Sequence, residues 1–458
     1  MNRRIVIVGG GITGLSSAFY VQKLASEKGL PVQVTLLEAS DALGGKVQSV
    51  KRDGFVIERG PDSFLKRKPE MLELVEWLGM GSQTIANQTG KSYILKDDEL
   101  HPIPEGSVMG VPSRLGPLLE TGLLSMDGKA RALNDLFIPK LPDFEDMSVG
   151  DFFDRRLGSE VVDHIISPLL SGIYAGDIYK LSLETTLPQF IDIQKRVGSL
   201  ILGLSGTAPK KKTSQFATVT GGLNSIIETL VESLEQSGVK IQKNTRAQAI
   251  EKQEDHYELG LADGRVVEAD AIILAVPHRI TEQLLPTADG LHRNNADPDT
   301  SVATISLAFD KDDVKMEKEG TGFVVSRREP KAITAATWTH MKWGHAAPEG
   351  KALIRCYVGK AGDDRIIERT DNELVETVLE NLGSTVTISG DPLFTVVSRW
   401  PNAMPQYPVG HKKWLAHVTE QLARDMPNIY LAGASYDGVG LPDCVRQAKT
   451  VAYKLLES

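Results

Sequence analysis

The chain has 458 residues, enough for two or three domains with sizeable hydrophobic cores. Its composition, 41% hydrophobic and 24% charged, is ordinary for a soluble globular protein. A net charge of −9 argues against general nucleic-acid binding, which requires a basic surface.

The cysteine content and hydropathy pattern predict a cellular compartment. Two cysteines, Cys356 and Cys444, are too few for a disulfide framework or a metal-ligand cluster, and they favour a reducing compartment. No apolar run approaches the roughly 18–20 residues of a transmembrane helix. The run Ile5–Val8 is too short for a signal peptide. We therefore expect a cytoplasmic protein without a bound metal, and peripheral contact with a membrane stays open.

The first predicted elements form a βαβ unit. A buried strand at Ile5–Val8 leads directly into a G-x-G-x-x-G motif at Gly9–Gly14. Apolar residues at helical spacing follow in Leu15–Ala25. A second strand, Val32–Leu37, ends at Glu38. This order of strand, glycine motif, helix, strand and terminal acid predicts a dinucleotide-binding site rather than a glycine turn without a ligand.

Each residue type in this unit has its own physical role. Gly9 allows a tight turn, Gly11 lets the backbone approach a pyrophosphate, and Gly14 lets helix and strand pack closely. The phosphates would lie on free N–H groups at the helix N-terminus. Glu38 can accept hydrogen bonds from a ribose hydroxyl, and its charge disfavours a 2′-phosphate, which argues against NADP.

Two further loops follow the acid. Gly44 and Gly45, next to Lys46, indicate that the backbone again passes close to an extended ligand. The segments Glu38–Ser40, Leu43–Lys46 and Glu58–Asp62 resemble the FAD-dependent amine oxidase and protoporphyrinogen oxidase superfamily. The resemblance implies that the dinucleotide is FAD.

The middle of the chain alternates between helical and strand-rich patterns. Residues from about 66 to 200 are predicted mainly helical, with a helix start of the S-x-x-D type at Ser148–Asp151 and an exposed lysine-containing loop near 209–214. An Asp263-Gly264 turn predicts a hairpin. Strands are predicted at Val239–Ile241, Ala247–Ile250, Tyr257–Leu261, Val266–Val267 and Ala271–Val276.

The C-terminal part is predicted to be a strand near Asn428–Ala432, a glycine-rich loop and a helix. Asp443 is a plausible N-cap of that helix. In the superfamily this junction lies beside the flavin, where a helix N-terminus would stabilise the anionic reduced ring. Cys444 is expected to be a buried core thiol rather than a covalent flavin site.

The resemblance also predicts the fold class, α/β (α+β overall). It implies a discontinuous Rossmann-like FAD domain built from residues 1–64, 215–277 and 400–458. A β-sheet substrate domain at 278–399 and a mainly helical domain at 65–214 would be inserted into it.

A closer resemblance lies in four longer sequence segments: Ile57–Leu65, Ser167–Asp177, Trp400–Tyr407 and Gly433–Cys444. They are similar to porphyrinogen oxidases, specifically the soluble coproporphyrinogen III oxidase type of Gram-positive bacteria. This resemblance implies an oxygen-dependent FAD enzyme of heme biosynthesis that removes six electrons from coproporphyrinogen III and releases coproporphyrin III and three H₂O₂. Hand-over of the product to a ferrochelatase is a further expectation.

The family's cofactor contacts carry over to matching positions of this chain. Ala247 departs from the family, which more often has valine there, but a backbone contact with the adenine would survive the change. No catalytic side chain is assigned, because the flavin supplies the chemistry. The residues expected to contact non-covalent FAD are Gly9, Gly10, Gly11, Ile12, Thr13, Gly14, Glu38, Ala39, Lys46, Gly60, Pro61, Asp62, Ser63, Ala247, Trp400, Val439, Gly440 and Leu441.

Basic residues near the presumed flavin loop are candidates for binding substrate carboxylates. Lys68 and Arg67 follow the Gly60–Ser63 loop closely, and Arg196 lies in a second basic pair. Lys210–Lys212 adds a third cluster. Each cluster can equally be solvated surface.

Three other interpretations stay open. The substrate can be protoporphyrinogen IX instead. The chain can be a different flavin oxidase acting on an amine or a carotenoid, with Trp400 and Tyr436 as an aromatic cage. It can also be a non-catalytic relative without flavin, although the intact glycine motif and Glu38 argue against that.

Overall fold

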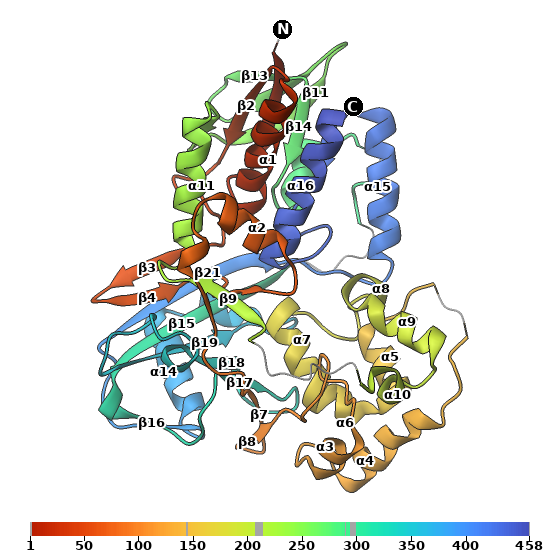
Figure 1. Ribbon diagram of the computed structural model, residues 1–458, viewed down its shortest axis with the longest axis vertical. Helices are drawn as coiled ribbons and strands as arrows, with labels where there is room; N and C mark the ends of the chain where they lie inside the picture. Colours follow the sequence, from red (N-terminus) through yellow and green to blue (C-terminus); the bar gives the residue numbers. More distant parts are fainter. Residues whose placement is uncertain (1, 143–144, 207–213, 289, 294–298, 458) are drawn as a thin grey trace.

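The computed structural model describes residues 2–142, 145–206, 214–288, 290–293 and 299–457. Figure 1 shows a region at the top that contains both chain ends, a β-rich region at the lower left and a helical region at the lower right. The predicted lysine cluster at Lys210–Lys212 lies outside the described residues.

The upper region is built on a five-stranded sheet in which all neighbouring strands are parallel. The strand order is β10-β2-β1-β14-β22, so strands from three distant parts of the chain share one sheet. This confirms the discontinuous Rossmann-like architecture. The strands are β1 (Arg3–Val8), β2 (Val32–Leu37), β10 (Lys240–Gln242), β14 (Ala271–Leu274) and β22 (Ile429–Leu431).

Helices cover both faces of this sheet, as its apolar strands require. One hydrophobic core packs α1 (Ile12–Lys28), α11 (Asn224–Gln236) and α16 (Leu441–Glu457) against it. On the other face of the sheet, a second hydrophobic core contains residues of α12 (His278–Leu284) and α15 (His411–Asp425). The three-stranded sheet β11 (Ala247–Lys252), β12 (Tyr257–Leu261) and β13 (Val266–Ala269) joins that second core.

The predicted Asp263-Gly264 hairpin is confirmed. β12 and β13 pair antiparallel, and Gly264 turns between them at a φ of +85°. β14 is shorter than predicted and ends at Leu274, two residues before Val276 and three before Pro277, which precedes α12.

The β-rich region is a seven-stranded sheet, covered by α14 (Asp371–Leu382) through Leu374, Val378 and Leu382. Its order is β21 (Phe394–Met404), β15 (Thr300–Asp310), β19 (Lys351–Val358), β18 (Ile333–Trp338), β17 (Gly322–Val325), β7 (Tyr93–Lys96) and β8 (Glu99–Pro102).

β7 and β8 lie within a range predicted as mainly helical. They form a hairpin whose turn residues, Asp97 and Asp98, both have positive φ, 53° and 57°. Such a turn is usually marked by Asn-Gly or Asp-Gly, so the Asp-Asp pair gave a weak signal. β7 joins the sheet by pairing with β17, more than two hundred residues later in the chain.

The helical region packs around its own hydrophobic core. The predicted start of α5 (Val149–Leu157) is confirmed, because the Ser148 hydroxyl accepts a hydrogen bond from the Asp151 N–H at 3.0 Å. The other helices are α3 (Leu115–Glu120), α4 (Met126–Leu133), α6 (Ser159–Val161), a π-helical turn Val162–Ile166, α7 (Ser167–Tyr174), α8 (Leu183–Thr186), α9 (Pro188–Arg196) and α10 (Leu200–Leu204).

The remaining strands and α-helices are short. They are β3 (Ser49–Arg52), β4 (Phe55–Glu58), β5 (Phe64–Leu65), α2 (Glu70–Trp77), β6 (Thr84–Ala86), β9 (Phe216–Val219), β16 (Val314–Met316), α13 (Thr339–Lys342) and β20 (Val386–Ile388). In the described part of the chain, no helix combines the length and apolarity needed to cross a membrane.

A fully buried ion pair lies in the helical core. Arg156 and Asp135 have no exposed side-chain surface, and the guanidinium donates to the Asp135 carboxylate at 2.7 Å. Ser199 and the Ile201 N–H donate to the second carboxylate oxygen at 2.7 and 3.0 Å. Each charge is therefore compensated, as burial requires.

We predict that Arg156→Met destabilises the protein by about 3–5 kcal/mol, because the Asp135 carboxylate would stay buried without its counter-charge. Arg155→Met is a matched control, since Arg155 is the exposed neighbour. Urea unfolding of the holoprotein measures both variants. A loss below about 1 kcal/mol for Arg156→Met would contradict the expected role of the pair.

Candidate functional site

The three motif glycines have the geometry that a dinucleotide turn requires. Gly9 has a φ of +109°, and a β-carbon at Gly14 would lie 1.9 Å from the Gly9 carbonyl oxygen. A β-carbon at Gly11, by contrast, would meet nothing within 4 Å. The backbone is therefore strained or crowded at the first and third positions and open at the second, where a pyrophosphate would approach.

Glu38 lies at the carboxyl end of β2, directly against this turn. Its Oε2 accepts a hydrogen bond from the Gly10 N–H at 2.7 Å, and its Oε1 accepts from the Ser40 N–H at 2.8 Å. The Glu38 carbonyl accepts from the Thr245 N–H at 2.8 Å. The last contact brings the start of β11, and with it Ala247, to the same edge of the sheet.

The second glycine pair and the third loop pack onto the first. The Gly44 N–H donates to the Gly10 carbonyl at 2.8 Å, and a β-carbon at Gly45 would lie 3.3 Å from Gly11 Cα. A β-carbon at Gly60 would lie 1.8 Å from the Lys46 carbonyl oxygen. Three successive loops of the first 60 residues thus approach one another through backbone contacts.

Lys46 is the cation beside the second glycine pair. Its Nζ donates to the Ala403 carbonyl, and burial lowers the pKa of its ammonium group. The residue as a whole is exposed, and the end of β21 fixes the position of its ammonium group.

Donors from the seven-stranded sheet fix the loop that contains Gly60. The Arg59 carbonyl accepts from Thr304 Oγ1 at 2.9 Å, from Trp400 Nε1 at 3.0 Å and from Arg355 Nη2 at 3.1 Å. The sequence prediction included Trp400 but missed Arg355. The available signal was a single arginine within the apolar strand Lys351–Val358.

The Asp62 carboxylate forms an ion pair and a hydrogen bond with residues of the protein itself. Its Oδ2 accepts from Lys342 Nζ at 2.7 Å and from Trp343 Nε1 at 3.3 Å. Burial alone would raise the pKa of the Asp62 carboxyl, but the charges of Lys342 and Arg355 outweigh it and hold that pKa well below its usual range. Asp62 therefore stays ionised and anchors its loop to α13.

The C-terminal glycine loop meets the first turn of α1. Gly433 and Gly438 have φ of +127° and +105°, and Gly433 lies beside Thr13. The Tyr407 hydroxyl accepts from the Gly438 N–H at 2.9 Å and donates to the Ala434 carbonyl at 2.5 Å. Tyr407 thus ties both ends of this loop, a role that no local pattern had signalled.

The predicted N-cap at Asp443 is wrong. α16 begins at Leu441, so Asp443 is the third residue of the helix rather than its cap. Its carboxylate instead forms an ion pair with Lys68, whose Nζ donates to both oxygens at 2.6 Å. An acid in the first turn of a helix is still favourable, because it faces the positive end of the helix dipole.

Cys444 belongs to the core beneath α16. Its thiol is 4% exposed, and burial raises its pKa. This is the environment of a small buried hydrophobe, as expected from the sequence.

The three substrate candidates lie in different settings. Lys68 is partly exposed and paired with Asp443, beside the Val439–Leu441 loop. Arg67 is exposed next to it. Arg196 is exposed in the last turn of α9, in the helical region.

Glu58 belongs to the Glu58–Asp62 segment of the motif, where no role was predicted for it, and burial strongly perturbs its carboxyl. Its Oε1 accepts from the Leu223 N–H at 2.7 Å, and its Oε2 accepts from Ser49 Oγ at 2.7 Å. Burial raises the pKa of the Glu58 carboxyl to about 7 in spite of these bonds. The group therefore changes charge around neutral pH.

Comparison with known proteins gives a consistent result over the whole chain. The pattern of flavin-containing amine oxidoreductases matches residues 12–456. The chain belongs to this family. Its cofactor is FAD, in agreement with the dinucleotide motif, and the described residues contain no cluster of three metal ligands.

Two curated relatives are similar over nearly their entire length. The coproporphyrinogen III oxidase of Bacillus subtilis is 47% identical, with 98% of this chain and 96% of that protein covered. The coproporphyrinogen III oxidase of Staphylococcus aureus is 40% identical, with coverage of 100% and 99%.

A solved structure from Exiguobacterium sp. 255-15, described as a candidate protoporphyrinogen oxidase, has a TM-score of 0.90. It is 39% identical, and each chain is covered completely.

We predict that Gly11→Val removes FAD from this flavoprotein without unfolding it. The new side chain would enter space that is open in the protein but required by a pyrophosphate. Absorbance at the flavin band and far-ultraviolet circular dichroism measure the two effects. Gly116→Val is a control, since Gly116 also has open space around it and no left-handed backbone but lies in α3 of the helical region. Full flavin content in Gly11→Val would show that the cofactor lies elsewhere.

We predict that Glu58 makes stability depend on pH. Since its folded pKa, about 7, exceeds the ordinary value of 4.5, its stabilising contribution is complete below pH 4.5 and is lost as the pH rises through 7. The difference between the two pKa values corresponds to about 3 kcal/mol.

Urea unfolding of wild type and Glu58→Gln between pH 4.5 and 8 tests this dependence. The stability of wild type relative to Glu58→Gln should fall by up to about 3 kcal/mol across this window. Glu99→Gln, at an exposed position of β8, should track the wild type. Parallel curves for wild type and Glu58→Gln would refute the assignment.

Proposed function

We propose that this flavoprotein is a coproporphyrinogen III oxidase of heme biosynthesis, which oxidises its substrate to coproporphyrin III. The observation that carries the proposal is similarity to the Bacillus subtilis coproporphyrinogen III oxidase at 47% identity over 98% of the chain. The glycine turn with Glu38, packed against two further loops, supports it.

When bound, FAD would itself be the hydride acceptor in such a reaction. The residues expected to contact it are the eighteen named from the sequence. Within that set, the backbone of Gly9–Gly14 offers N–H groups to the pyrophosphate, and Glu38 offers a carboxylate to the ribose. Arg355, Thr304 and Trp400 act through the Arg59 carbonyl, by holding the adjoining loop in place.

Basic residues near the site must balance the negative charge of the substrate. Four propionates carry about −4 at neutral pH, and the net charge of the chain is −9, so long-range attraction cannot bring the two together. Lys68 is the best single candidate, because it lies at the Val439–Leu441 loop. Its pairing with Asp443 means that a propionate has to share the ammonium with a carboxylate already in place.

We predict that Lys68→Ala raises KM for coproporphyrinogen III about tenfold, the value of one charge-assisted hydrogen bond. The effect on kcat should be smaller, because the lysine binds a propionate and not the reacting carbon. Lys66→Ala, an exposed lysine two residues earlier, is the matched control. An unchanged KM at low and physiological salt would exclude Lys68 and direct attention to Arg67 and Arg196.

Protoporphyrinogen IX is the second candidate substrate. The chloroplastic protoporphyrinogen oxidase 1 of Arabidopsis thaliana is 28% identical over 98% of this chain. Steady-state rates with the two porphyrinogens decide between them. A higher kcat/KM for coproporphyrinogen III supports the proposal, and a higher value for protoporphyrinogen IX overturns it. Failure of both, with turnover of an amine, would favour an amine oxidase.

The reaction partners follow from this proposal. O₂ would be the electron acceptor, so porphyrin formation should consume oxygen and release H₂O₂. The product would pass to a ferrochelatase, and the enzyme would work in the cytoplasm or at a membrane surface. Turnover under strict anaerobiosis at an undiminished rate would contradict the role of O₂.

A further inference from the structure

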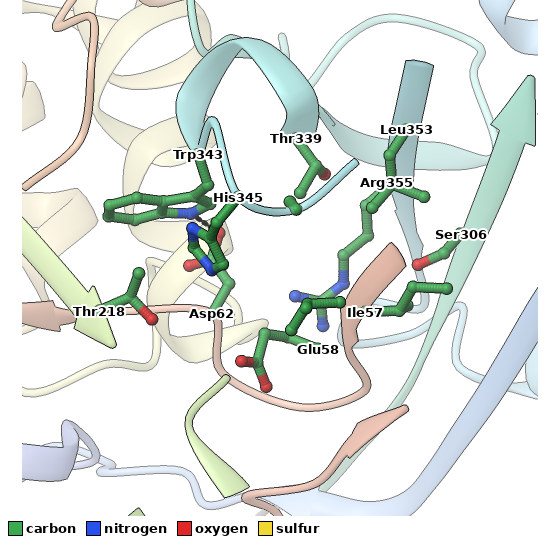
Figure 2. A pocket seen from close by; sticks show the side chains of 12 residues that line it. Ile57, Glu58, Asp62, Thr218, Ser306, Thr339, Trp343, His345, Leu353 and Arg355 are labelled. Atoms are coloured by element: carbon green, nitrogen blue, oxygen red, sulfur yellow. Dashed lines mark hydrogen bonds between the residues drawn. The ribbon is translucent and has the colours of Figure 1, made fainter. Parts of the chain in front are cut away.

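A small internal cavity lies behind the loop that contains Asp62, where β4, β9, β19 and the segment after α13 meet. Figure 2 shows Glu58, Asp62, Thr218, His345 and Arg355 around the same space. Trp343 forms part of its wall and donates to Asp62. The cavity is therefore lined by charged and polar side chains as well as apolar ones.

Three polar atoms in its wall are buried without a hydrogen-bond partner among the described residues. They are Thr218 Oγ1, His345 Nδ1 and Arg355 Nε. Thr218 is 1% exposed and Arg355 is 3% exposed, so bulk water does not reach them. An unpaired buried polar atom costs about 1–3 kcal/mol, and three around one cavity point to a missing common partner.

The size of the cavity limits what that partner can be. The space that a water molecule can occupy is about 10 Å³. One water needs about 10–15 Å³ of such space and two to four polar neighbours. A larger anion or an organic molecule does not fit.

The charges around the cavity argue against an ion. Arg355 and Lys342 would repel a cation, and the Asp62 carboxylate would repel an anion. Water is dipolar, so it can accept from Arg355 Nε and donate to a histidine nitrogen or a carboxylate at the same time.

We propose that this cavity binds one ordered water molecule, held by Arg355, Thr218 and His345, and that this water connects the carboxyl of Glu58 to the partly exposed His345. The site is independent of the porphyrinogen assignment, because it rests only on the protein's own side chains.

The water would give the carboxyl of Glu58, which lines the cavity and is itself only partly exposed, a further route for its proton. The two carboxyl oxygens of Glu58 accept hydrogen bonds from the Leu223 N–H and from Ser49 Oγ. The nearby charged groups are Arg355 and Asp62. His345 is partly exposed. Burial lowers the pKa of His345, so the proton resides on Glu58 and passes through the histidine only transiently.

The first test is a crystal structure of the holoprotein at a resolution that resolves ordered water. We expect one density peak within hydrogen-bond distance of Thr218 Oγ1 and Arg355 Nε. An empty cavity in that map, or an ion in place of water, would overturn the proposal.

The second test measures the link to Glu58. Thr218→Val keeps the shape of the side chain but removes one water ligand, so the Glu58 anion loses solvation. The pH midpoint for Glu58, obtained from unfolding of each protein with and without Glu58→Gln, should rise by about 0.5–1 pH unit. An unchanged midpoint would show that the water does not serve Glu58.

Thr84→Val is the matched control. Thr84 Oγ1 is also buried without a partner and lies on β6, which pairs with β9, but Thr84 does not line the cavity. It should leave the Glu58 midpoint unchanged. An equal rise in Thr84→Val and Thr218→Val would mean that a general change in the sheet, and not the water, causes the effect.

Discussion

The absence of side chains where three loops meet is the constraint on which this structure depends. Gly14 must approach the Gly9 carbonyl so closely that a β-carbon would lie 1.9 Å from the oxygen. Gly60 meets the same limit at the Lys46 carbonyl, at 1.8 Å. Any larger residue at these positions would separate α1 from its strand, or the third loop from the second. The three loops can meet because these contacts are backbone against backbone.

The site is shared between regions of the molecule that lie far apart in sequence. The glycine turn and Glu38 come from the parallel sheet, but the next loop is held by Thr304, Arg355 and Trp400 of the seven-stranded sheet. Tyr407, which packs in the helical core, fixes the C-terminal loop. The position of the loops beside the glycine turn therefore depends on side chains of the seven-stranded sheet and of the helical core.

Charges in the interior are arranged in compensated groups. Asp62 is balanced by Lys342 and Arg355, and Asp443 by Lys68. Among the described residues Glu58 has no cation within hydrogen-bond distance, so the cheaper response to burial is to take up a proton. Of the two acids in the Glu58–Asp62 segment, Asp62 is thus charged at neutral pH, while Glu58 titrates near it.

The sequence by itself determined the βαβ unit, the glycine roles, the place of Glu38 and the start of α5. These features depend on steric limits and hydrogen bonds within a few residues, which leave a local pattern. The resemblance of longer sequence segments to known proteins further predicted the family and the discontinuous parallel sheet.

Tertiary structure decided what depends on distant partners. The sequence makes Lys68 a candidate for binding a substrate carboxylate, but only the fold shows that Asp443, 375 positions away, is its ion-pair partner. β7 is a strand because β17 pairs with it. Arg355 points at the Arg59 carbonyl, 296 positions away, and only the packed sheets bring the two together. Periodicity describes which face of an element is buried, but it carries no information on which distant residue will lie opposite.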